Sequence, residues 1–128
     1  MRIEHIALQV SEPAAMASWY CAHLGMKVVR QKGGECFFIA DEGGRVVLEI
    51  YYNPAAKLPD YAAMDPLELH VAFASEDVRG NAERLIAAGA APASEQDYAP
   101  TPDGSVFAML RDPWGLAVQL VRRARALI

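Results

Sequence analysis

Four short apolar segments of the chain each carry one side chain that can bind a metal ion. These side chains are two imidazoles, a carboxylate and an amide, at His5, His70, Glu49 and Gln119. The segments around them are rich in Val, Ile, Leu and aromatic residues and are bounded by turn formers, which predicts β-strands. Imidazole nitrogens together with carboxylate and amide oxygens suit a divalent first-row metal. The four residues are therefore candidate metal ligands.

The neighbours of these residues on the predicted strands are mostly small. Side chains alternate across a strand, so residues two apart share a face. The small residues that share a face with a candidate ligand are Ala7 beside His5, Ala72 and Ala74 beside His70, and Ala117 beside Gln119. Such neighbours leave room for an ion or a ligand. Glu49 is the exception, since Val47 and Tyr51 flank it.

The predicted elements occur in the same order in both halves of the chain. The first half contains a strand at 2–10, a helix at about 12–24, and strands near 27–31, 35–40 and 45–52. The second half contains a strand at 67–74, a helix at about 76–88, and strands near 91–95, 104–111 and 115–123. His70 follows His5 at nearly the same separation as Gly89 follows Gly25. The sequence therefore predicts two copies of one βαβββ unit.

Capping residues mark the ends of the two predicted helices. Ser11 and Ser75 are placed as N-caps, with acidic residues in the first turn that follows each. Gly25 and Gly89 fall where a residue in the left-handed conformation would end each helix.

Turn formers mark the segments between the strands. Residues 53–66 hold three prolines and no strand pattern, so we expect them to connect the two copies. Residues 98–104 form a second irregular stretch. The prolines in both stretches predict surface segments that frame the mouth of a cavity. The sequence from Asp112 to Gly115 predicts a turn, with proline in second and glycine in fourth position.

Composition limits the class of protein. A chain of 128 residues predicts a single domain, 1–128, and 53% hydrophobic with 22% charged residues is typical of a globular protein. The net charge of −4 argues against a nucleic-acid surface, and we expect the cluster of Arg122, Arg123 and Arg125 to be a solvated chain end. No apolar run approaches the roughly 18 residues of a membrane span, and no signal-peptide pattern is present, so a cytoplasmic protein is expected. Cys21 and Cys36 match no zinc or redox motif and are expected to be reduced.

The doubled βαβββ unit, with H…E…H…Q in order on four strands, resembles the vicinal oxygen chelate superfamily. This superfamily includes glyoxalase I, bleomycin-resistance proteins and extradiol dioxygenases. The resemblance implies an α+β fold in which modules at about 1–56 and 65–125 form a curved, cavity-enclosing mixed sheet with helices on its outer face. It also implies a homodimer and one divalent metal (Zn, Ni, Co, Mn or Fe) held by His5, Glu49, His70 and Gln119.

The position of the carboxylate separates this chain from its relatives. In glyoxalase I the ligand on the eighth strand is usually glutamate, which transfers protons, whereas this chain has Gln119 there. An amide does not usefully accept a proton near neutral pH, so a glyoxalase-type proton transfer would depend on Glu49 alone as the catalytic base.

Three functions follow from the resemblance. The first is a metal-dependent lyase or isomerase, similar to glyoxalase I, acting on a small oxygen-chelating substrate with a thiol such as glutathione as a possible co-substrate. The second is a metal-free ligand-binding protein of the bleomycin-resistance type. The third is an Fe(II) extradiol dioxygenase using His5, His70 and Glu49, which the family pattern disfavours because the carboxylate is on the wrong strand. The sequence leaves the substrate and the metal open.

Overall fold

The computed structural model describes residues 1–127. The chain divides into two compact units, Met1–Pro59 and Asp60–Ile128, called module one and module two below. The division falls inside the stretch 53–66 that the sequence indicates as the connection. Each module is described by itself.

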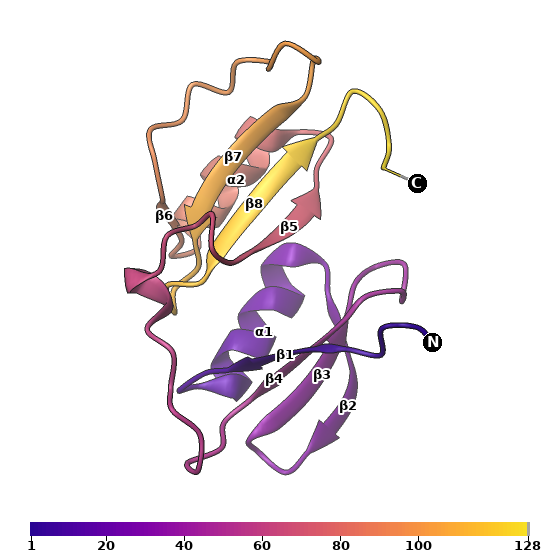
Figure 1. Cartoon of the computed structure of the whole chain (residues 1–128), viewed down its shortest axis with the longest axis vertical. Helices are drawn as coiled ribbons and strands as arrows, with labels where there is room; N and C mark the ends of the chain where they lie inside the picture. Colours follow the sequence, from indigo (N-terminus) through magenta and orange to yellow (C-terminus); the bar gives the residue numbers. More distant parts are fainter. Residues whose placement is uncertain (128) are drawn as a thin grey trace. The chain divides into compact units, whose positions relative to one another are not determined.

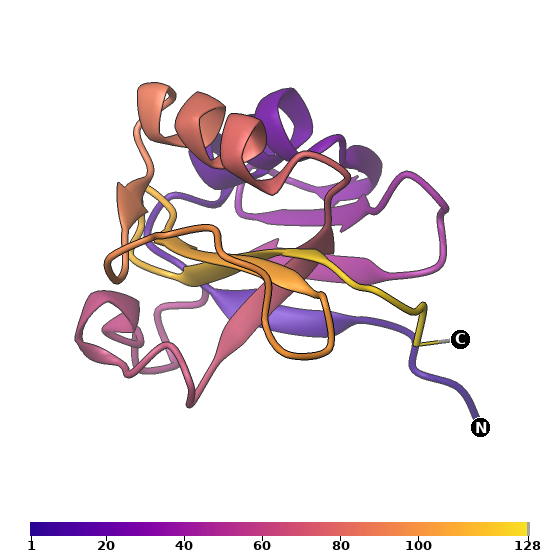
Figure 2. The same cartoon turned by 90° about the horizontal axis from the view of Figure 1, so that it is seen from above.

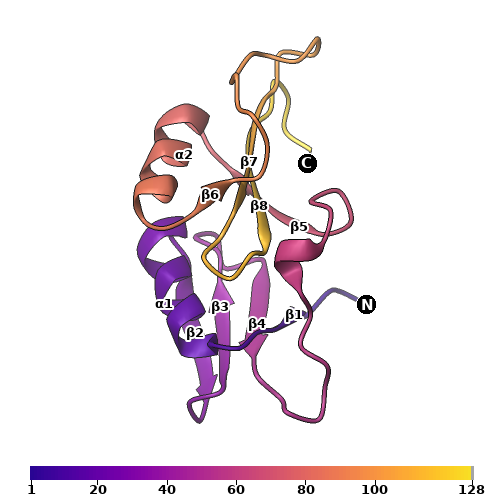
Figure 3. The same ribbon diagram turned by 90° about the vertical axis from the view of Figure 1, so that its left-hand side faces the viewer.

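Module one is a βαβββ unit (Figure 1). Its elements are β1 (Ile6–Gln9), α1 (Pro13–Leu24), β2 (Lys27–Lys32), β3 (Cys36–Ala40) and β4 (Val47–Tyr51). The strands form a four-stranded sheet in the order β1-β4-β3-β2, in which β1 runs parallel to β4 and the other pairs are antiparallel. Helix α1 covers one face of this sheet (Figure 3). The buried residues on that side include Met16 and Tyr20 of α1 and Leu8, Ile39, Leu48 and Ile50 of the strands.

Module two repeats the unit. After a short 3-10 helix, η1 (Tyr61–Ala63), it contains β5 (His70–Ala74), α2 (Val78–Ala87), β6 (Ala91–Pro92), β7 (Val106–Arg111) and β8 (Ala117–Arg122). The strand order is β5-β8-β7-β6, again with a parallel first pair. Helix α2 lies over one face of this sheet (Figure 2). Val78, Ala82 and Leu85 are its buried residues.

The predicted fold class is confirmed. The chain is an α+β protein of two βαβββ modules, each with a four-stranded mixed sheet and one helix on one of its faces. Neither sheet closes into a barrel within the described strands. Of the two α-helices in residues 1–127, neither has the length and hydrophobicity to cross a membrane.

The predicted N-caps, Ser11 and Ser75, are wrong, although the helices begin within two residues of the predicted starts. Helix α1 has Glu12 in place of Ser11 at the N-cap, because Pro13 follows and its fixed φ starts the helix there. Helix α2 has Asp77 at the N-cap, where the carboxylate accepts a hydrogen bond from Gly80 N at 2.9 Å. Ser75 is buried, and its hydroxyl accepts a hydrogen bond from Asn81 Nδ2. The glycines at the helix ends are as predicted, with φ of 69° at Gly25 and 107° at Gly89.

Two long polar side chains form hydrogen bonds with the segment that connects the modules, one near each end of that segment. The amide of Gln9 donates to the carbonyls of Asn53 and Ala56 at 2.7 and 3.2 Å and accepts from Asn53 N at 2.9 Å. The guanidinium of Arg111 donates to the carbonyls of Tyr61 and Met64 at 3.0 and 2.8 Å. These bonds satisfy backbone groups that no strand pairing would satisfy.

Segment 61–63 also packs closely against the turn before β8. The predicted turn is present, since Gly115 N donates to Asp112 O at 2.9 Å. Gly115 has a φ of 89°, and a Cβ there would lie 2.7 Å from Ala62 Cβ and 2.8 Å from Ala62 N. Only glycine permits both this backbone conformation and this approach.

Gly115→Ala should therefore destabilise the protein by about 2–4 kcal/mol, the combined cost of a left-handed alanine and of overpacking. Urea unfolding monitored by circular dichroism measures the change. Gly34→Ala is the matched control, because nothing lies within 4 Å of a Cβ at Gly34. Equal stability of the two variants would contradict the proposed close packing.

Candidate metal centre

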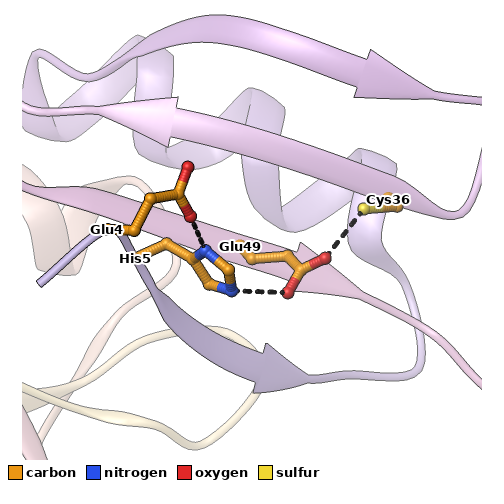
Figure 4. Close-up of polar contacts among 4 residues, drawn as sticks. All are labelled: Glu4, His5, Cys36 and Glu49. Carbon is orange, nitrogen blue, oxygen red and sulfur yellow. Dashed lines mark hydrogen bonds and ion pairs between the residues drawn. The ribbon is translucent and has the colours of Figure 1, made fainter.

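In module one, the strand register brings His5 and Glu49 together. Parallel pairing of β1 with β4 sets Ala7 opposite Glu49, and His5 lies just before β1, two residues from Ala7. His5 Nε2 is 3.2 Å from Glu49 Oε2. The two side chains are 33% and 21% exposed, so a dissolved ion can reach them. The structure thus places the first two candidate ligands side by side (Figure 4).

Two further residues hold this pair, and the sequence analysis did not identify either as part of the site. Glu4 Oε2 accepts a hydrogen bond from His5 Nδ1, and Cys36 Sγ donates to Glu49 Oε1 at 3.3 Å (Figure 4). The His5 ring also packs edge-on against Phe38, with 5.5 Å between ring centroids. The alternation of β3 places Phe38 and Cys36 on the Glu49 face, which is the sequence signal that could have identified Cys36.

The contacts in this cluster shift the pKa values of three of its residues. The hydrogen bond to the Glu4 carboxylate raises the pKa of His5, and the Glu49 carboxylate adds to the effect. The same hydrogen bond lowers the pKa of Glu4. Burial, followed by the hydrogen bond to Glu49, raises the pKa of the Cys36 thiol, so Cys36 is a neutral donor near pH 7. Both nitrogens of His5 thus face carboxylate oxygens, which favours a cation, either a proton or a metal ion, on Nε2.

In module two, His70 and Gln119 occupy the equivalent positions. Parallel pairing of β5 with β8 sets Ala72 opposite Gln119, and His70 lies two residues before Ala72. The offset between histidine and oxygen ligand is therefore the same as in module one. His70 Nδ1 lies 2.8 Å from Pro66 O, and a carbonyl can only accept, so Nδ1 is the donor in this contact and Nε2 is the ring nitrogen left to bind another group.

Each module thus supplies one histidine and one oxygen donor. In both, a nearby acceptor binds Nδ1, which is the arrangement that orients a histidine to bind a metal through Nε2. No group of three or more His, Cys, Asp or Glu side chains suited to a metal is found among residues 1–127. The donor set in either module fits part of a divalent-metal shell, and a full shell needs further ligands.

The repeated fold, with candidate ligands at equivalent positions, defines a class of proteins built from two βαβββ modules. A family model described as Glyoxalase/Bleomycin resistance protein/Dioxygenase superfamily matches residues 2–120, and the chain belongs to this superfamily. The resemblance noted from the sequence is therefore confirmed. A comparison with curated proteins finds no match.

Solved structures with the same fold include a glyoxalase family protein from Bacillus cereus. It has a TM-score of 0.77 and 15% identity, with 96% of this chain and 94% of that one covered. TnmS3, an antibiotic binding protein from Streptomyces sp. CB03234, has a TM-score of 0.69 and 23% identity, with 97% and 99% covered. A third protein, SMU.1112c, has a TM-score of 0.68 and 28% identity, with 95% and 98% covered. These likenesses establish the fold.

The contact between Glu4 and His5 has a measurable consequence. Glu4→Gln should lower the pKa of His5 toward its ordinary value near 6.5, because the variant removes the anionic acceptor at Nδ1. An NMR titration of the histidine ring protons in metal-free protein measures the shift, with the His5 signal assigned from a His5→Ala sample. Glu42→Gln, a change of the same type at an exposed position, is the control. If His5 titrates at the same pH in both variants, the contact does not set its pKa.

Proposed function

We propose that this protein is a metal-dependent lyase or isomerase, similar to glyoxalase I, that acts on a small substrate with two chelating oxygens. His5, Glu49, His70 and Gln119 would hold one divalent ion. We also propose that the active form is a homodimer, as closed two-fold pairing is the commonest oligomer.

The observation that carries the proposal is the equivalence of the two ligand pairs. Each module has a histidine at or just before the start of its first strand and an oxygen donor on its last strand, at the same register offset. Both imidazoles have Nδ1 bound by a local acceptor. A structural role for one such histidine would be ordinary, but it would not explain why the whole arrangement is repeated.

The chemistry of the site follows from its donors. A divalent ion with one carboxylate ligand keeps a net positive charge, which polarises a bound carbonyl or hydroxyl oxygen. Glu49 is the one carboxylate among the four residues and is therefore the base that removes or returns a substrate proton. Cys36 fixes one oxygen of Glu49 by donating to Oε1, which leaves Oε2 toward His5. Gln119 can bind and orient but cannot transfer a proton. A thiol such as glutathione remains a possible co-substrate.

A second candidate function is sequestration of a ligand without chemistry. The specific observation in its favour is the structural likeness to TnmS3, an antibiotic binding protein. Under this reading, His5 and Glu49 would be an ion pair that shapes the binding surface. The metal content of the protein separates the two candidates.

Protein purified without chelators, or supplied with Zn or Ni, should contain one divalent ion per chain by elemental analysis. His5→Ala and His70→Ala should each remove most of this metal, since each deletes a nitrogen ligand. His23→Ala is the control, because His23 lies in the last turn of α1 away from the candidate ligands. Metal-free wild-type protein, or unchanged metal content in both ligand variants, would refute the proposal and favour sequestration.

Gln119→Glu tests why the chain departs from the glyoxalase pattern. The variant places an anionic oxygen close to a dication, so metal affinity should rise. Turnover of the glutathione–methylglyoxal hemithioacetal should rise by about 10²-fold if a second base is what wild type lacks. Glu49→Gln should abolish whatever activity wild type has. Wild-type turnover that survives Glu49→Gln would show that Glu49 is not the base.

A further inference from the structure

A cavity lies at one end of the sheet in module two. Its volume is about 450 Å³, within the range of small-molecule sites. Most of its lining is apolar and comes from the two paired strands and from the segment that follows β8. The lining includes Ala72, Ala74, Val121, Arg123, Ala126 and Leu127.

The cavity continues the face that carries His70 and Gln119. Alternation along β5 places Ala72 and Ala74 on the face of His70. Ala72 pairs with Gln119 and Ala74 pairs with Val121, so the cavity begins beside Gln119 and extends toward the end of β8. It is hollow there because two alanines follow His70 where larger side chains would fill the space.

A cationic side chain, Arg123, lies at the far end of this cavity. The segment after β8 curves away from the strand (Figure 1), and Arg123 within it holds its guanidinium 5.7 Å from the centre of the Phe107 ring. Phe107 pairs with Val121, which lines the cavity, so Arg123 is held against the same face of the sheet. Arg122 also lines the cavity, and so does one acidic residue, Glu76. In a chain of net charge −4, this wall is locally positive. Arg123 is exposed, as the sequence predicts for this chain end, and it also contacts the Phe107 ring.

We propose that this cavity binds the anionic end of an elongated substrate, a carboxylate on a short hydrocarbon stem, with Arg123 as its anchor. The inference rests on the proposed function for the other end of the substrate, the chelating oxygens near His70 and Gln119. Gln119 and Arg123 are four residues apart, which is roughly 13 Å of extended chain. The alanines and valine accommodate the stem, and a guanidinium binds a carboxylate through two parallel hydrogen bonds.

Hexanoate is a suitable probe of this cavity. Titration into ¹⁵N-labelled, EDTA-treated protein should shift the amide signals of Ala72, Ala74 and Val121 in a saturable way. Hexanamide, which has the same stem without the charge, should bind about tenfold more weakly, as should hexanoate to Arg123→Gln. Ala74→Leu should abolish binding by filling the cavity. Arg125→Gln is the matched control, because Arg125 belongs to the same basic cluster but does not line this cavity.

Arg123 is exposed, so its substitution should leave the fold intact. If hexanoate and hexanamide bind equally well, or if Arg123→Gln and Arg125→Gln lose the same affinity for hexanoate, then Arg123 is not the anchor. If the amide signals of Ala72, Ala74 and Val121 do not shift, the cavity is not a binding site for the anion. Elemental analysis of the same protein after Zn loading separates this inference from the proposed function. Hexanoate binding without metal binding refutes only the metal centre, and metal binding without hexanoate binding refutes only the cavity.

Discussion

Parallel pairing of the first and last strands in each module is the constraint on which the candidate site depends. It sets Ala7 opposite Glu49 in one module and Ala72 opposite Gln119 in the other. The histidine two residues earlier then shares a face with the oxygen donor on the neighbouring strand. Because side chains alternate with a period of two, a slip of one residue would move the histidine to the opposite face. The pairing of the candidate ligands therefore follows from the backbone register.

The helix side of each sheet fixes this register. In module one, Leu48 and Ile50 flank Glu49 and are 2% and 0% exposed on the side covered by α1. Moving them out of the core would cost about 1.5–3 kcal/mol for each side chain. The apolar residues on one face thus hold the polar residues in place on the other. A functional face can then carry charges and small residues that contribute little to stability.

The sequence alone predicts the features that depend on local periodicity. The two βαβββ units, the faces of His5 and His70, and the glycines that end the helices follow from alternation and from residue type. The contacts made by Cys36, Gln9 and Arg111 do not, because each joins residues far apart in the chain. The N-caps predicted at Ser11 and Ser75 are wrong because Pro13 starts α1 after Glu12, and because the Asp77 carboxylate reaches the N–H of Gly80 at the start of α2. The contact of Arg123 with Phe107 also does not follow from local periodicity, because it depends on the pairing of β7 with β8.

The two modules carry the same fold but different chemistry. In module one the imidazole is bound by a carboxylate, and the oxygen donor is a carboxylate that accepts a hydrogen bond from a thiol. In module two the imidazole is bound by a neutral carbonyl, the oxygen donor is an amide, and the nearby charges are mostly cationic. Negative charge favours holding and moving protons, whereas a neutral face with a cation at its end favours binding an anionic molecule without reacting with it. Under the proposed function, proton transfer would thus belong to module one and binding of the anionic end of the substrate to module two. Gln119, the residue that departs from the glyoxalase pattern, lies on the binding side of that division.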